Sequence, residues 1–213
     1  MVEHRREFQR ELEAIEAKVT GLFAMVADGL PRATYALVSG NSEVLGVLAD
    51  RERVIDALYR EIDELASREI LLQAPVASDL RFLLSVVRIV PELERSHDLV
   101  VQIASRAEHG LSEELSPDSR RLVERMGDLA WGMWRQVGDS WRHRDRSVAV
   151  ALGERHGQMN ELHASLIAEL ASGRVTLPAA MEMTLVARFY ERLGDHAVNL
   201  ARRVIDLAGS APG

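Results

Sequence analysis

The sequence predicts an all-α protein built from two tandem, pseudo-symmetric three-helix bundles. Apolar residues recur at helical spacing along nearly the whole chain, and no stretch is rich in strand-forming residues. Residues 94–104 and 191–201 share one frame, Glu-Arg-x-x-Asp-x-x-x-amide-aliphatic-Ala, and the helices before them align at residues 50–58 and 154–162. Aromatic residues make up only 5% of the chain, so aliphatic side chains and methionine must fill the core.

The first bundle is expected in residues 1–110. Apolar side chains at helical spacing predict a first helix over residues 3–28. Gly29 and Pro31 are expected to interrupt or kink it, because glycine weakens a helical turn and proline lacks the backbone donor. A short helical piece at residues 33–38 should then complete this element.

Two further helices complete the first bundle. The second is predicted over residues 42–73, with Ser42 as its N-cap. The third is predicted over residues 78–108 and contains Pro91. A bend is expected there, because this proline removes the hydrogen bond to the carbonyl of Val87 and its ring crowds that carbonyl.

The second bundle is expected in residues 116–209. Ser116 is the predicted N-cap of the fourth helix, and Pro117 lies in its first turn, where a missing N–H does no harm. The fifth helix is expected over residues 148–173 and the sixth over residues 176–208. The chain should therefore contain six helices in all.

Charge and composition exclude several classes of function. A net charge of −7 and a pI near 5.5 disfavour binding to a nucleic-acid backbone. The absence of cysteine excludes disulfides, thiolate metal sites and cysteine nucleophiles, and it suits a reducing compartment. No apolar signal core and no run of 18 apolar residues is present. We therefore expect a cytoplasmic protein.

The second frame suggests a cation site. Glu191, Asp195 and Asn199 fall on one side of a helix, away from its apolar positions. Carboxylates four residues apart repel each other by about 0.2–0.5 kcal/mol unless a cation relieves them. Oxygen ligands with one imidazole suit iron, manganese or zinc. With help from the fifth helix, the expected ligands are Glu191, Asp195, Asn199, Glu154, His156 and Asn160. The alternative is a solvated helix face on which Arg188 and Arg192 pair with the two acids.

The first frame suggests a second such site. Its expected ligands are four carboxylates from two helices, Glu94, Asp98, Glu52 and Asp56. Here too the alternative is neutralisation by neighbouring arginines. The candidates for that role are Arg51, Arg53 and Arg95.

The sequence contains no recognisable set of catalytic residues. No glycine-rich phosphate loop, His-Glu-x-x-His motif or Gly-x-Ser-x-Gly elbow occurs. An enzyme with a carboxylate-bridged di-metal centre is therefore only a third hypothesis, because such centres lie inside a bundle whereas these acidic rows point outward. Trp134 and Trp141 occupy apolar helical positions and are predicted to be core or half-buried residues.

The chain resembles the PhoU family, regulators associated with bacterial phosphate uptake. Three stretches carry the resemblance: residues 73–81 (Gln-Ala-Pro-Val-Ala-Ser-Asp-Leu-Arg), residues 94–98, and residues 191–201. The family is similar in fold, with two three-helix bundles, and its Glu-x-x-x-Asp motifs bind iron or zinc clusters on the bundle surface. Four residues of this chain match those motifs, Glu94, Asp98, Glu191 and Asp195.

The resemblance also implies a function. It implies a negative regulator of the phosphate-starvation response, acting through contact with the ATPase of a phosphate-specific ABC transporter and with a sensor histidine kinase. The chain would then be a homodimeric adaptor, not an enzyme, and peripheral to the membrane only through its partners. The leading alternative is a metal-free helical adaptor for another transporter or signalling protein.

Overall fold

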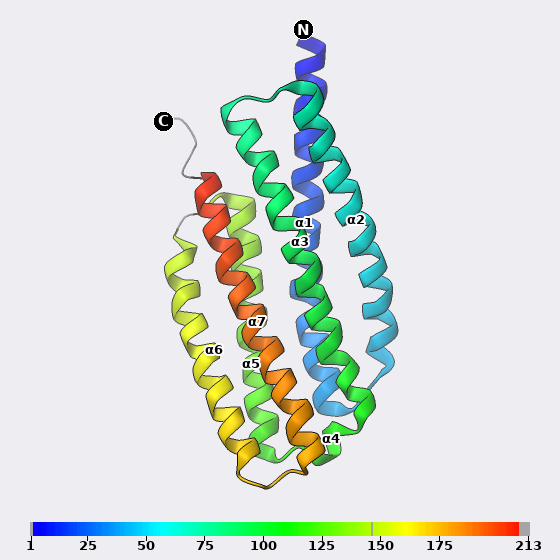
Figure 1. Ribbon diagram of the computed structural model, residues 1–213, viewed down its shortest axis with the longest axis vertical. Coiled ribbons are helices and arrows are strands. Elements are labelled where there is room, and N and C mark those ends of the chain that lie inside the picture. The colour runs from blue at the N-terminus through cyan, green and yellow to red at the C-terminus, as the bar shows by residue number, and fades with distance from the viewer. Residues whose placement is uncertain (1, 146, 209–213) are drawn as a thin grey trace.

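In the described part of the chain, six long helices lie side by side in an elongated bundle (Figure 1). The computed structural model describes residues 2–145 and 147–208. Within these ranges every regular element is helical and no strand occurs. The long helices are α1 (Val2–Ser39), α2 (Glu43–Gln73), α3 (Ala77–Ser105), α5 (Pro117–His143), α6 (Val148–Ala171) and α7 (Leu177–Ala208). A 3₁₀ turn, η1 (Arg106–His109), and a one-turn helix, α4 (Leu111–Glu114), connect the two halves.

The helices form two groups of three that share one core. α1, α2 and α3 contact one another, as do α5, α6 and α7, while α1 packs on α5 and α3 packs on α7 to join the groups. This arrangement confirms the predicted fold class. Because the buried residues form one continuous cluster, the core does not divide the chain, and the boundaries at residues 1–110 and 116–209 stay predictions.

The expected interruption of the first helix is wrong, because α1 continues through Pro31 to Ser39. Side chains on both sides of the proline, including Leu30, Ala33 and Leu37, are fully buried against neighbouring helices. This packing outweighs the loss of one backbone hydrogen bond. α3 is likewise uninterrupted at Pro91, and the bend expected there stays a prediction.

Helix ends differ from expectation at two of three places. Ser116 is an N-cap as predicted, since its Oγ accepts a hydrogen bond from the Ser119 backbone N–H at 3.0 Å. The Ser42 side chain makes no capping bond. Instead the Oδ1 atom of Asn41 accepts from the Glu43 N–H at 2.8 Å, so the neighbouring residue supplies the cap. The third helix ends at Ser105, before η1, and so is shorter than predicted.

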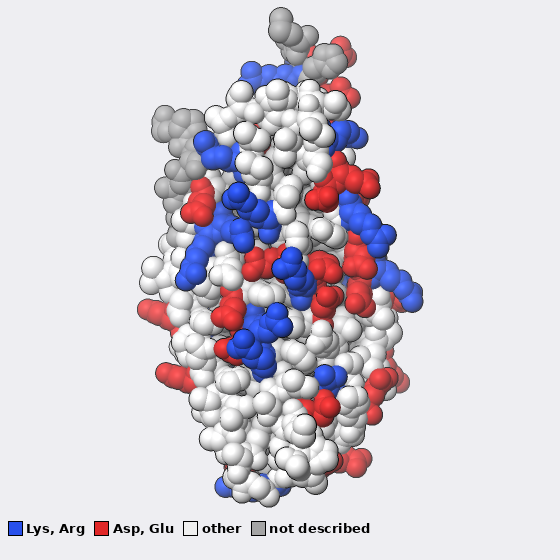
Figure 2. Space-filling view, in the orientation of Figure 1, with Lys and Arg blue, Asp and Glu red and all other residues white. Residues whose placement is uncertain are grey.

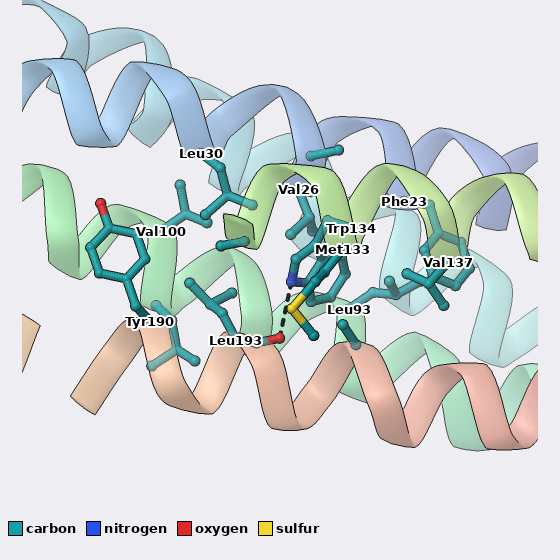
Figure 3. Close-up of a cluster of buried hydrophobic side chains, with 14 of the residues drawn as sticks. Phe23, Val26, Leu30, Leu93, Val100, Met133, Trp134, Val137, Tyr190 and Leu193 are labelled. Atoms are coloured by element: carbon teal, nitrogen blue, oxygen red, sulfur yellow. Dashed lines mark hydrogen bonds between the residues drawn. The ribbon is translucent and has the colours of Figure 1, made fainter. Parts of the chain in front are cut away.

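Aromatic side chains fix α7 against the central helices (Figure 3). Trp134 and Trp141 are fully buried, as the sequence predicted. The indole N–H of Trp134 donates to the Leu193 carbonyl oxygen at 3.1 Å, which satisfies a buried donor and joins α5 to α7. Leu193 lies within the second acidic frame, so this contact helps to position the frame.

A buried hydroxyl pair joins α1 to α7. The Thr34 hydroxyl donates to the Leu30 carbonyl oxygen at 2.9 Å. The Tyr190 hydroxyl lies 2.8 Å from Thr34 Oγ1 and therefore donates to it. A glycine on α5, Gly127, makes room for Thr34, because a Cβ atom at that position would lie 2.3 Å from Thr34 Oγ1. Three helices thus meet at one polar contact inside an apolar core.

No helix in the described part of the chain combines the length and the apolar character that crossing a bilayer would require.

Candidate functional site

The two acidic frames lie on α3 and α7, which pack side by side at the boundary between the halves (Figure 1). The Oγ atom of Ser96 on α3 lies 2.8 Å from the Nδ1 atom of His196 on α7. Each frame therefore contributes one side chain to this boundary. The acids of the α3 frame face α2, and those of the α7 frame face α6, as their contacts show below.

The α3 frame forms part of a carboxylate cluster, which we call the first acidic cluster. It consists of Glu52, Asp56, Glu94 and Asp98, all partly buried between α2 and α3. Within the described residues, none of the four forms an ion pair. The carboxylates act on one another: burial, then Asp98 and then Asp56 raise the pKa values of Glu52 and Glu94. Burial and then Asp56 raise the pKa of Asp98. The four predicted ligands are thus brought together.

Neighbouring arginines do not neutralise the first acidic cluster by direct pairing. Arg51 donates instead to the Met25 carbonyl oxygen at 2.8 Å, and Arg53 pairs with Asp50 at 2.9 Å. Arg95 forms no ion pair with any described residue. The charge of Arg95 partly offsets the rise in the pKa of Glu94, and the charge of Arg53 partly offsets the rise in the pKa of Glu52. The salt-bridge alternative is therefore weak in the first half.

The α7 frame differs, because basic groups already pair with its acids. Glu191 forms an ion pair with Arg188, and His163 Nε2 lies 4.0 Å from Glu191 Oε2. Asp195 Oδ1 lies 2.8 Å from His156 Nε2 on α6. The salt-bridge alternative therefore fits Glu191. Sequence reasoning missed His163, although it follows His156 by seven residues and so lies two turns further along the same side of α6.

The remaining predicted ligands do not converge on this second row. Asn199 hydrogen-bonds to the Glu92 side chain of α3. Glu154 lines a surface hollow between α5 and α6, together with Asp128, rather than facing α7. Asn160 is exposed. Of the three predicted ligands on α6, only His156 lies against the acidic side chains of α7.

The donor set suits a hard cation better in the first half than in the second. Carboxylate oxygens on neighbouring helices are the ligands that iron, manganese and zinc accept in bundles. As placed, however, no three acidic or histidine side chains among the described residues converge closely enough to hold one ion. Binding would require the carboxylates of the first acidic cluster to turn toward one another. A metal at either row stays a prediction.

The fold and the frames define a class of protein, a duplicated three-helix-bundle protein with a Glu-x-x-x-Asp motif in each repeat. The model of the PhoU domain matches this chain twice, over residues 19–107 and 123–204. The chain belongs to the PhoU family, which confirms the resemblance seen in the sequence. Membership in this family of accessory proteins also confirms the expectation that the chain is not an enzyme.

Relatives of known name match over nearly the full length. The chain is similar to "Phosphate-specific transport system accessory protein PhoU homolog 1" of Mycobacterium leprae, with 30% identity over 213 residues that cover 98% of this chain and 96% of the relative. The PhoU homolog of Zymomonas mobilis is 29% identical, covering 92% of this chain and 84% of the relative. A crystal structure of PhoU from Pseudomonas aeruginosa has a TM-score of 0.88 at 26% identity, covering 96% of this chain and all of that one.

Proposed function

We propose that this chain is a cytoplasmic accessory protein that regulates phosphate transport and restrains the phosphate-starvation response. The observation that carries the proposal is the end-to-end match to relatives named as accessory proteins of a phosphate-specific transport system. The bundle then acts by binding other proteins.

Exposed apolar side chains support an adaptor role. Leu177, Met181 and Leu185 recur every four residues on α7 and are 74%, 64% and 45% exposed. A row of large apolar side chains on one helix is typical of a surface that docks on a partner. As partners we propose the ATPase of a phosphate-specific ABC transporter and a sensor histidine kinase, with the chain acting as a homodimer.

We further propose that a divalent or trivalent cation, iron, zinc or manganese, binds at the first acidic cluster when it is available. The clustered and unpaired carboxylates of that cluster support this proposal. In the second row, the ion pair of Glu191 with Arg188 and the close approach of His156 to Asp195 favour the metal-free alternative.

A deletion strain tests the proposed function. Phosphate uptake and a phosphate-starvation reporter are measured in the source organism with and without the gene, at high and low phosphate. The expected result is a reporter that stays on at high phosphate in the deletion strain and is switched off again by the wild-type gene. An unchanged reporter and unchanged uptake in the deletion strain would contradict the proposal.

A further inference from the structure

A row of arginines follows the boundary between α3 and α7. The two helices run antiparallel (Figure 1), and two contacts fix their register: Ser96 Oγ lies 2.8 Å from His196 Nδ1, and Glu92 Oε2 lies 3.5 Å from Arg203 Nε. Figure 2 shows several groups of Lys and Arg side chains down this face, with Asp and Glu side chains between and beside them. Counting from these contacts, the order along the boundary is Arg88, Arg203, Arg95 and Arg192, which we call the arginine row.

Most of the arginines in this row have no direct ion-pair partner among the described residues. Arg88, Arg95 and Arg192 are exposed, and none of them forms an ion pair within the described part of the chain. Only Arg203 has an acidic partner. The chain carries 33 acidic residues against 26 lysines and arginines, so a shortage of acids does not explain the unpaired guanidinium groups.

The two central arginines come from equivalent positions of the duplicated frame and act on the same place. Arg95 and Arg192 each follow the first glutamate of their frame. Burial and then Arg192 lower the pKa of His196, and Arg95 lowers it further. Both guanidinium groups act on one imidazole at the boundary, Arg95 from α3 and Arg192 from α7. The duplication thus places two like charges along the same boundary, and neither forms an ion pair with a described residue.

We propose that the arginine row is the docking surface for an acidic segment of a partner protein. Guanidinium groups bind carboxylates through paired, charge-assisted hydrogen bonds. From Arg88 to the level of Arg192 the row spans roughly 20 Å, at about 1.5 Å per helical residue. An acidic helix of about 13 residues covers that length at the same rise, and an extended segment of about six residues covers it at ~3.3 Å each.

The flanking acids favour a narrow protein segment over a broad anionic surface. The first acidic cluster borders the row on the α2 side, and Glu191 and Asp195 border it on the α6 side. A bilayer or a nucleic acid would press its phosphates against these carboxylates, whereas a single acidic segment contacts only the arginines. The inference rests on the proposed adaptor function and specifies the partner's chemistry.

A labelled peptide of 14 glutamates tests the inference by fluorescence anisotropy at 50 mM and 200 mM salt. The test variant is R88Q/R95Q/R192Q. Its matched control is R32Q/R60Q/R125Q, which removes the same charge from exposed arginines of α1, α2 and α5 that form no ion pair within the described residues. We expect the test variant to bind the peptide at least tenfold more weakly than wild type, and the control to stay within about threefold.

Equal weakening in both variants, or no binding by wild type, would overturn the inference. Stronger wild-type binding to phosphatidylglycerol vesicles or to a 14-nucleotide oligothymidylate would do the same. A second variant, R88K/R95K/R192K, keeps the charge but loses the paired hydrogen bonds, and it should bind at an intermediate level. The peptide titration needs no transport protein. A negative peptide titration therefore does not change the result of the deletion experiment, and a negative deletion experiment does not change the result of the peptide titration.

Discussion

Replacing Asp98 with Asn should stabilise the protein, although it removes a charge from a partly buried site. The Asp98 carboxylate acts on those of Glu52, Glu94 and Asp56, so its charge enters three repulsive pairs. At about 0.2–0.5 kcal/mol for each partly exposed pair, their removal should add roughly 0.6–1.5 kcal/mol to the free energy of unfolding at pH 7. In a chain of this length, 1 kcal/mol raises Tm by about 2–4 °C.

The gain should depend on pH in a defined direction. Burial and Asp56 raise the pKa of Asp98 in the folded state above its ordinary value of 3.8, so the folded protein holds this proton more tightly than the unfolded chain. The contribution of Asp98 to the free energy of unfolding is therefore most favourable in acid, and it is lost as the pH rises through the raised pKa. The advantage of Asp98→Asn should be largest at neutral pH and shrink as the pH falls toward 4.

Urea unfolding in a chelating buffer measures this effect, with Asp63→Asn as the control. Asp63 is exposed on α2 and has no ion-pair partner within the described residues, so its replacement should change stability by less than about 0.5 kcal/mol. When Mn²⁺ is added, the wild type should gain more than Asp98→Asn, because the cation relieves the same repulsion. A loss of stability in Asp98→Asn at pH 7 without metal would refute the reasoning.

Two further predictions concern the contact of α1, α5 and α7. Gly127→Ala should lower the free energy of unfolding by about 1–3 kcal/mol, because the new Cβ would lie 2.3 Å from Thr34 Oγ1. Its control, Gly153→Ala, has open space around the new Cβ and should raise the free energy of unfolding by roughly 0.5–1 kcal/mol. Thermal melts in which both variants shift Tm in the same direction would contradict this. Tyr190→Phe should cost about 0.5–1.5 kcal/mol through loss of the hydrogen bond to Thr34. Because both changes act through Thr34, the Gly127→Ala and Tyr190→Phe effects should not add in the double variant, and additive costs would show that the three residues are not coupled.

The sequence predicted the helices well because their signals are local and repeated. Buried positions such as Trp134 and Trp141 follow from apolar spacing alone, and Ser116 followed by Pro117 marks a helix start by its chemistry. The continuity of α1 through Pro31 was not predictable in this way. It depends on packing against α3 and α5, which the local sequence does not contain.

The sequence predicted which acids share one side of a helix, but not which groups those acids pair with. The i, i+4 spacing of Glu94 with Asp98 places both acids on one side of a helix, and the duplicated frame indicates where α2 contributes Glu52 and Asp56. Which basic group pairs with which acid depends on side-chain geometry between helices. The sequence therefore did not predict the hydrogen bond between Asn199 and Glu92. It also did not predict that the acids of the α7 frame have basic partners while those of the first acidic cluster have none within the described residues.

Direct binding to the phosphate transporter tests the central claim most sharply. The purified chain is titrated against the ATPase subunit of the phosphate-specific ABC transporter from the same organism, with the ATPase of an unrelated transporter as control, and binding is followed by calorimetry. The account predicts saturable binding to the first ATPase only, weakened when Leu177, Met181 and Leu185 are replaced together by Ser. Equal binding to both ATPases, or none to either, would contradict it.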